Sequence, residues 1–302
     1  MTTSKSPLSV ARVAYTAALR SLPAYTHPKS PKKFTQPQLA ACLVLKEFFK
    51  TDYRGIAAIL EDSSDIRAVL ELNQVPHFTT LQKSARQLLN KRTIKKLIKS
   101  ILSIAHEEKL IGPKVSLAAL DGSGFESHHI SRYFVQRRDR AVKDKYQTSH
   151  YQRFPKVGIV CDTKNHLILS GIPERGPKFD RTHFKPAILE AVAQKPIHTL
   201  LADAGYDGEQ NHVFIREQLH IKSFIPSLIG RKTLKLPSTY YRRLMATRFN
   251  KKAYGQRWQV ETVFSMIKRN LDSFLRARTF WSQCREIMLR IFTHNVTIVL
   301  SW

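Results

Sequence analysis

The pattern of apolar residues changes at Gly112-Pro113, and this break constrains the fold more than any other feature of the sequence. Before it, residues 94–105 repeat apolar side chains at helical spacing. After it come short β-like runs separated by turn residues: VSLAAL, VGIVCD, HLILSGI, HTLLAD and IKSFIP. Helical segments are expected between and after these runs. This order predicts an α/β fold, with a mixed sheet flanked by helices and preceded by an all-helical domain.

Three parts of the chain follow from this pattern. Residues 1–33 are predicted to form a basic flexible arm, because Pro23, Pro28 and Pro31 stand among lysines there. Residues 34–112 are predicted to form the helical domain, and residues 113–302 the α/β domain.

The charge of the chain is strongly unbalanced. Lys and Arg number 50 against 23 Asp and Glu, which gives a formal net charge of +27. A compact fold with this charge repels itself unless a polyanion binds to it, and nucleic acid is the polyanion we expect. Charge alone leaves open two other interpretations, namely solubility and general adhesion to RNA or membranes.

The cysteines and the N-terminus indicate where the protein works. Cys42, Cys161 and Cys284 lie far apart, show no metal-ligand spacing and are too few for a disulfide framework. The first residues, MTTSKSPLSVARVAY, lack the apolar core of a signal peptide, and no apolar stretch long enough to cross a membrane follows. We therefore expect a cytoplasmic protein without a membrane anchor.

Two aspartates follow apolar runs that are predicted to be buried strands. Asp121 ends VSLAALD and precedes Gly122, and Asp203 ends HTLLAD in the same way. A single aspartate of this kind is most simply a turn residue, and Asp207 in the turn GYDG is the nearest competitor of Asp203. Two such carboxylates in one domain, however, indicate a metal site.

A third candidate segment is the helix YGQRWQVETVFSMIK, which spaces Tyr254, Arg257, Glu261 and Lys268 as Y-x2-R-x3-E-x6-K. At about 100° per residue, these four side chains fall within a stripe roughly 60° wide on one helix face. The alternative is a solvated surface with a helical ion pair, which contributes about 0.3–0.5 kcal/mol.

Carboxylates in this pattern suit phosphoryl transfer on DNA. Breaking a phosphodiester develops charge on the attacking and leaving oxygens, and two Mg²⁺ ions can stabilise both. Oxygen ligands are those that Mg²⁺ prefers, whereas Arg257 and Lys268 on the same stripe can hold phosphates.

The motifs DGSGF, ADAGYD and Y-x2-R-x3-E-x6-K resemble those of the DDE transposases of prokaryotic insertion sequences, in the branches numbered four and five. The resemblance implies a ribonuclease-H-like fold in residues 113–302. It implies that Asp121, Asp203 and Glu261 are catalytic and hold two Mg²⁺ ions, with Mn²⁺ as a substitute. Tyr254, Arg257 and Lys268 would contact DNA near the scissile phosphate.

The helical domain is also similar, more loosely, to the DNA-binding region that precedes the catalytic domain in these transposases, through YRGIAAIL and VPHFTTLQKSARQL. A plain helical bundle is the alternative. The resemblance implies a homodimer that cuts double-stranded DNA at terminal inverted repeats and joins the 3′-hydroxyl to target DNA. A nuclease or resolvase of the same fold and a catalytically silent DNA-binding relic remain open as alternatives.

Overall fold

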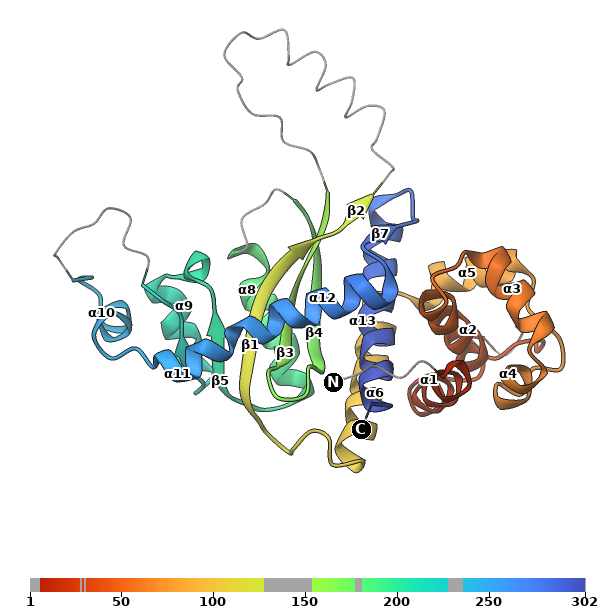
Figure 1. The fold of residues 1–302 in the computed structure, drawn as a ribbon, viewed down its shortest axis with the longest axis horizontal. Coiled ribbons are helices and arrows are strands. Elements are labelled where there is room, and N and C mark those ends of the chain that lie inside the picture. Colours follow the sequence, from red (N-terminus) through yellow and green to blue (C-terminus); the bar gives the residue numbers. More distant parts are fainter. Residues whose placement is uncertain are drawn as a thin grey trace, which may run out of the picture.

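The computed structural model describes residues 6–27, 29, 31–127, 154–176, 181–227 and 236–301. Figure 1 shows the N-terminal helices at one end of the molecule and the sheet toward the other, with α6 and α13 between them. The N-terminal helices are α1 (Pro7–Ser21), α2 (Gln36–Phe48), α3 (Tyr53–Asp62), α4 (Ser64–Val69) and α5 (Phe78–Leu88), and α6 (Lys91–Glu107) follows them.

The prediction of a flexible arm over residues 1–33 is wrong where α1 lies. Pro7 begins this helix, and one face is fully buried against α2 and α6. The buried side chains are Val10, Ala11, Ala14, Ala17 and Ala18. Small side chains at this helical spacing let neighbouring helices approach closely, while Pro23 and Pro31 lie beyond the end of the helix. Residues 1–5, 28 and 30 lie outside the described residues.

The sheet of the second half has the strand order β4-β3-β1-β5-β6. Strands β1 (Val115–Gly124), β3 (Pro155–Asp162) and β4 (Ile168–Arg175) are antiparallel neighbours, while β5 (Ile197–Ala202) and β6 (Lys222–Phe224) continue the sheet in parallel with β1. A second small sheet pairs β2 (Glu126–Ser127) with β7 (Phe274–Leu275). This mixed sheet, with helices on its faces and a helical region before it, confirms the predicted α/β fold class.

Helices cover both faces of the sheet. Helix α12 (Gln259–Leu271) crosses in front of it in Figure 1, where it packs against β1 and β3. Helix α8 (Arg181–Gln194) packs against β3 and β4 from behind. The remaining elements are η1 (Ala204–Tyr206), α9 (Glu209–Val213), η2 (Phe214–Gln218), α10 (Tyr240–Thr247), α11 (Lys251–Tyr254), η3 (Gly255–Trp258) and α13 (Phe280–Val299). No helix in these described ranges is long and apolar enough to span a bilayer.

Helix α13 joins the two halves of the molecule, and the sequence patterns did not predict it. It packs against α2 and α6 on one side and against β3 and β4 on the other. Asn295 fastens it to the sheet, because its side chain accepts a hydrogen bond from the Ile168 amide and donates one to the Ile168 carbonyl, each 2.8 Å long. One hydrophobic core therefore runs from Val10 in α1 to Val299 in α13.

Candidate active site

Asp121 lies where β1 loses one of its neighbours. The pairing of β1 with β5 stops at Leu120 and Ala202, whereas the pairing with β3 continues to Gly124. Asp121 therefore lies inside β1. The apolar run had predicted it at the end of the strand. From this residue on, β1 is paired in the sheet on one side only, and the Asp121 side chain is 22% exposed.

Asp203 occupies the matching position on the neighbouring strand. It follows Ala202 directly, as Asp121 follows Leu120, and those two preceding residues are register partners on parallel strands. Adjacent strands lie about 4.8 Å apart, so the sheet brings the two aspartates together. Asp203 also caps η1, because its Oδ1 accepts a hydrogen bond of 2.7 Å from the Ala204 amide.

The predicted Y-R-E-K face spans three consecutive helical elements. Tyr254 ends α11, Arg257 lies in η3, and Glu261 and Lys268 lie in α12. The backbone stays in the right-handed helical region across both junctions, so the path of the chain is nearly continuous. Element η3 packs against β1 and β5, and α12 buries Val260, Val263, Phe264 and Ile267, which sets the polar face beside the strands.

Arg257 joins two of the three predicted acids. Its Nη1 donates a hydrogen bond of 3.1 Å to Asp121 Oδ2, and its Nη2 donates one of 2.5 Å to Glu261 Oε1. Burial opposes the charge on Arg257, but the hydrogen bond to Glu261 and the nearby Asp121 outweigh it and raise the pKa of Arg257. The guanidinium group of Arg257 is thus brought to a carboxylate 136 positions away in the chain.

Tyr254 lies within reach of the charges of both aspartates. Burial raises the pKa of Tyr254, and the negative charges of Asp203 and Asp121 raise it further, against the opposing charge of Arg257.

Lys268 reaches the other end of the same stretch of β1. Its Nζ donates a hydrogen bond of 2.9 Å to Ser123 Oγ and lies 5.5 Å from the centre of the Phe125 ring. Burial lowers the pKa of Lys268. Sequence reasoning had not assigned Ser123 a role, although it stands in the DGSGF motif two positions after Asp121.

Asp207 is bound elsewhere. Its side chain is only 2% exposed, and its Oδ2 accepts a hydrogen bond of 2.9 Å from Arg242 on α10. A buried carboxylate that is already held in an ion pair is poorly placed to bind a metal ion from solution. The structure therefore favours Asp203 over Asp207 as the functional acid of ADAGYD.

The donors offered by the three predicted acids fit a divalent cation. Asp121, Asp203 and Glu261 supply only carboxylate oxygens, which Mg²⁺ and Mn²⁺ prefer. As they stand, the described residues include no group of three or more His, Cys, Asp or Glu side chains arranged to hold a metal ion. The guanidinium of Arg257 is the cation that Asp121 and Glu261 share here.

Comparison with known proteins adds a family to this geometry. Residues 113–296 match the family model described as "Transposase DDE domain". No curated protein matches the chain. A solved structure, the Mos1 mariner paired end complex with Mn, is similar at 13% sequence identity, covering 92% of this chain and 81% of that chain, with a TM-score of 0.24. That TM-score is too low for the likeness to support an argument.

Proposed function

The chain belongs to the family of transposases with a DDE domain, and we propose that Asp121, Asp203 and Glu261 are the three acids of its active site. Membership implies an enzyme that cuts DNA and transfers the cut strand. The observation that carries the residue assignment is the convergence of the acids: Asp121 and Asp203 follow partnered residues on β1 and β5, and Arg257 links Asp121 to Glu261.

DDE transposases use divalent metal ions, and we propose two Mg²⁺ ions, replaceable by Mn²⁺, at these acids. When bound, the ions would stabilise charge on the attacking and leaving oxygens of the phosphodiester. Three carboxylates close together repel one another, and Arg257 relieves this repulsion at Asp121 and Glu261 in the structure described here. A metal ion held by those acids would compete with Arg257 for them, which would make its guanidinium available to a DNA phosphate.

The remaining residues of the helical path then position DNA. We propose that Tyr254, Arg257 and Lys268 contact the backbone near the phosphate to be cut. Arg257 bonds Asp121, Lys268 bonds Ser123 two positions further along β1, and Tyr254 lies one helical turn before Arg257. We propose that residues 34–112 bind the terminal inverted repeats as a DNA-binding domain, and that residues 113–302 form the catalytic domain. Cutting at two element ends and joining them to a target implies a homodimer on DNA, which works in the cytoplasm.

A joining assay tests this function. The purified protein is mixed with DNA that carries the inverted repeats of its own genomic element, with Mg²⁺ and with a target plasmid. A transposase yields joined products, whereas a nuclease or resolvase cuts without joining and a silent relic does neither. Absence of joined product, in the presence of cutting, would overturn the transposase assignment in favour of a nuclease.

A further inference from the structure

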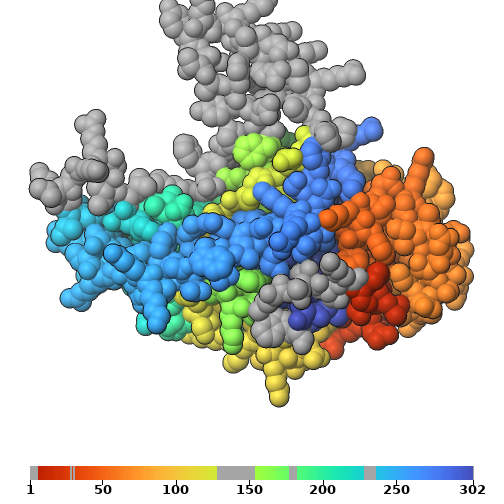
Figure 2. All heavy atoms as spheres, viewed as in Figure 1, coloured from red at the N-terminus to blue at the C-terminus, as the bar shows by residue number. Residues whose placement is uncertain are grey.

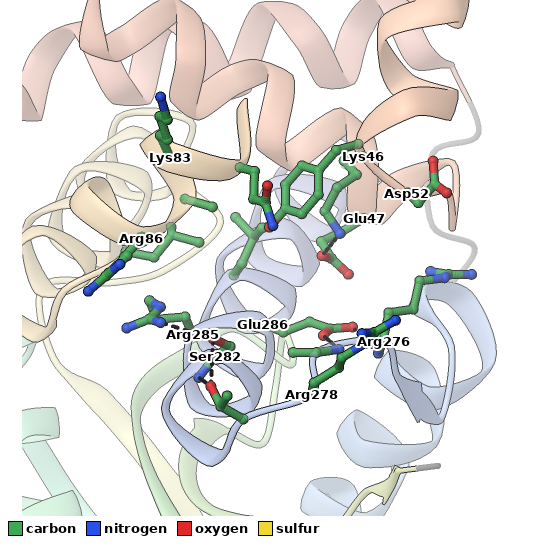
Figure 3. Close-up of a pocket in the computed structure, with 17 residues that line it drawn as sticks. Lys46, Glu47, Asp52, Lys83, Arg86, Arg276, Arg278, Ser282, Arg285 and Glu286 are labelled. Carbon is green, nitrogen blue, oxygen red and sulfur yellow. Dashed lines mark hydrogen bonds and ion pairs between the residues drawn. The ribbon is translucent and has the colours of Figure 1, made fainter. Parts of the chain in front are cut away.

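A basic groove lies between the N-terminal helices and the start of α13, and none of the three acids lines it. It has a volume of about 820 Å³ and is lined by residues of α2, α3, α5 and the segment 276–289. Six basic side chains line it against three acidic ones. The basic set is Lys46, Lys83, Arg86, Arg276, Arg278 and Arg285. Figure 3 shows that these side chains come from both walls of the groove.

The acidic side chains of the groove are already engaged, so they do not cancel its charge. Glu47 is buried in ion pairs with Lys46 and Arg290. Glu286 accepts hydrogen bonds from the amides of Arg276 and Ala277 and pairs with Arg290 as well. Asp52 caps α3 by accepting from two backbone amides.

Several basic side chains of the groove keep their charge unpaired. Within the described residues, Lys83, Arg86, Arg278 and Arg285 form no salt bridge. Three of them, Lys83, Arg86 and Arg278, are exposed. Unpaired cations spread over two walls of a groove suit an anion with several charges along its length better than a single small anion.

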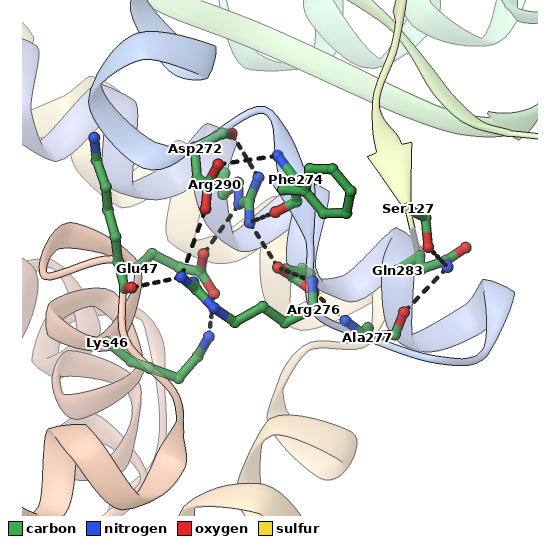
Figure 4. Close-up of polar contacts among 11 residues, drawn as sticks. Lys46, Glu47, Ser127, Asp272, Phe274, Arg276, Ala277, Gln283 and Arg290 are labelled. Carbon is green, nitrogen blue, oxygen red and sulfur yellow. Dashed lines mark hydrogen bonds and ion pairs between the residues drawn. The ribbon is translucent and has the colours of Figure 1, made fainter. Parts of the chain in front are cut away.

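A buried arginine, Arg290, connects two of the elements that line the groove, α2 and α13. Arg290 on α13 pairs with Glu47 on α2 at 3.1 Å and with Glu286 at 2.6 Å, and it donates to the carbonyls of Asp272 and Phe274 (Figure 4). Arg290 is completely buried. This network therefore fixes α2, which carries Lys46, against the start of α13, which carries Arg285.

A short stretch of the chain connects the candidate active site to the groove. Helix α12 carries Glu261 and Lys268 and leads through β7 directly to Arg276. At its end, Lys50 donates a hydrogen bond of 2.8 Å to the Arg269 carbonyl, and Arg276 donates one of 2.6 Å to the Lys50 carbonyl. Figure 2 shows these C-terminal segments running across one face to meet the N-terminal helices. Glu261 and Leu271 are ten residues apart on α12, which corresponds to about 15 Å along the helix axis.

We propose that this groove binds the sugar-phosphate backbone of duplex DNA beyond the site of cutting, an inference that rests on the proposed function. The DNA partner fits because its phosphates recur every 3.4 Å along a strand and can meet cations on both walls. Backbone contacts of this kind position the duplex without reading its sequence. The groove would thus hold the flank of the DNA while α12 presents the acids to one phosphate.

Two substitutions, one on each wall, test the groove. Arg86→Gln on α5 and Arg278→Gln before α13 are made singly and together in the full chain. Binding of a random-sequence duplex oligonucleotide is measured by fluorescence anisotropy at several salt concentrations. The double variant should bind roughly tenfold more weakly at low salt, and the slope of log K against log salt should fall in magnitude by about 1.8, since each lost phosphate contact removes about 0.9.

A charge-matched control separates the groove from the overall charge. Lys99→Gln combined with Lys114→Gln removes the same charge from exposed positions outside the groove and should leave the salt slope unchanged. Thermal unfolding is used to check that each variant is folded. Lys83→Gln repeats the test at a second exposed side chain of the α5 wall. Wild-type affinity and slope in the groove double variant, or an equal loss in the control, would overturn the proposal.

The groove and the active-site assignment can fail separately. The groove is judged on binding to random-sequence DNA, which needs no cleavage. Glu261→Gln is judged on cleavage, and if that variant stays active the assignment of the acids fails while the binding result still stands.

Discussion

At Asp121, Asp203 and Glu261, the loss of one charge should separate catalysis from binding. Asp121→Asn, Asp203→Asn and Glu261→Gln should each slow Mg²⁺-dependent cleavage and joining by more than about 100-fold, because loss of even an outer partner of a metal ligand costs 10- to 100-fold. Duplex binding should survive. Gel assays of cut and joined products, with anisotropy for binding, make the measurement.

Two further variants calibrate this result. Glu108→Gln, at an exposed position after α6, removes one carboxylate and should keep full activity. Asp207→Asn should lower stability rather than stop the chemistry, since the buried Asp207 carboxylate loses its charge-assisted hydrogen bond from Arg242. An active Glu261→Gln enzyme, or a folded but inactive Asp207→Asn enzyme, would contradict the assignment.

Arg257 should matter for the reaction more than for folding. Arg257→Ala removes the cation that Asp121 and Glu261 share, so Mn²⁺ should bind at least as tightly as before, measured by calorimetry. Cleavage should nevertheless slow roughly 100-fold, the size expected when one preorganised donor to a reacting group is lost. Lys268→Ala should also slow cleavage. A lower melting temperature with an unchanged rate in the folded fraction would instead support a purely structural ion pair.

Among the contacts between elements, the one between α2 and α13 should contribute much of the free energy of unfolding. Arg290→Met leaves Glu47 and Glu286 buried without their shared partner, and the free energy of unfolding should fall by about 3–5 kcal/mol in urea titrations. Arg20→Met is the matched control, because its pair with Glu107 on α6 is exposed and contributes at most about 1 kcal/mol. Equal losses of unfolding free energy in the two variants would show that the buried network contributes no more than an exposed ion pair.

The same contact should depend on pH. Burial tends to raise the pKa of Glu47, but the charges of Lys46 and Arg290 outweigh it and lower that pKa from its ordinary 4.5. The stability from a lowered carboxyl pKa is present above pH 4.5 and is lost as pH falls through the folded value. The wild-type protein should therefore lose more unfolding free energy than Glu47→Gln between neutral pH and pH 3, measured by denaturant titration. Parallel pH profiles of the two proteins would contradict this.

For the whole molecule, the net charge of +27 should make DNA binding strongly salt-dependent. The logarithm of the affinity should fall linearly with the logarithm of salt concentration, by about 0.9 for each phosphate neutralised. Anisotropy titrations over a range of NaCl concentrations check this. A flat response would mean that backbone phosphates contribute little to the interface.

The sequence by itself determined which segments become the strands of the five-stranded sheet and which helix face carries Tyr254, Arg257, Glu261 and Lys268. These features depend on near neighbours in the chain, so alternation and helical spacing reveal them. The family resemblance added the assignment of the three acids, which stays a proposal. Helix α1 was missed because its buried face consists largely of alanines, which give a weak apolar pattern, and because the neighbouring prolines suggested an extended arm.

Only the tertiary structure decided which of these faces meet. It placed Arg257 between Glu261 and Asp121, and Asp121 lies 136 positions from Arg257 in the chain. It also placed Arg290 against Glu47, 243 positions away. It also bound Asp207 to Arg242 and gathered cations from α5 and the start of α13 along one groove. A periodic pattern reports which side of an element is apolar, but it does not identify the partner of that side. That choice is made by packing the whole core at once.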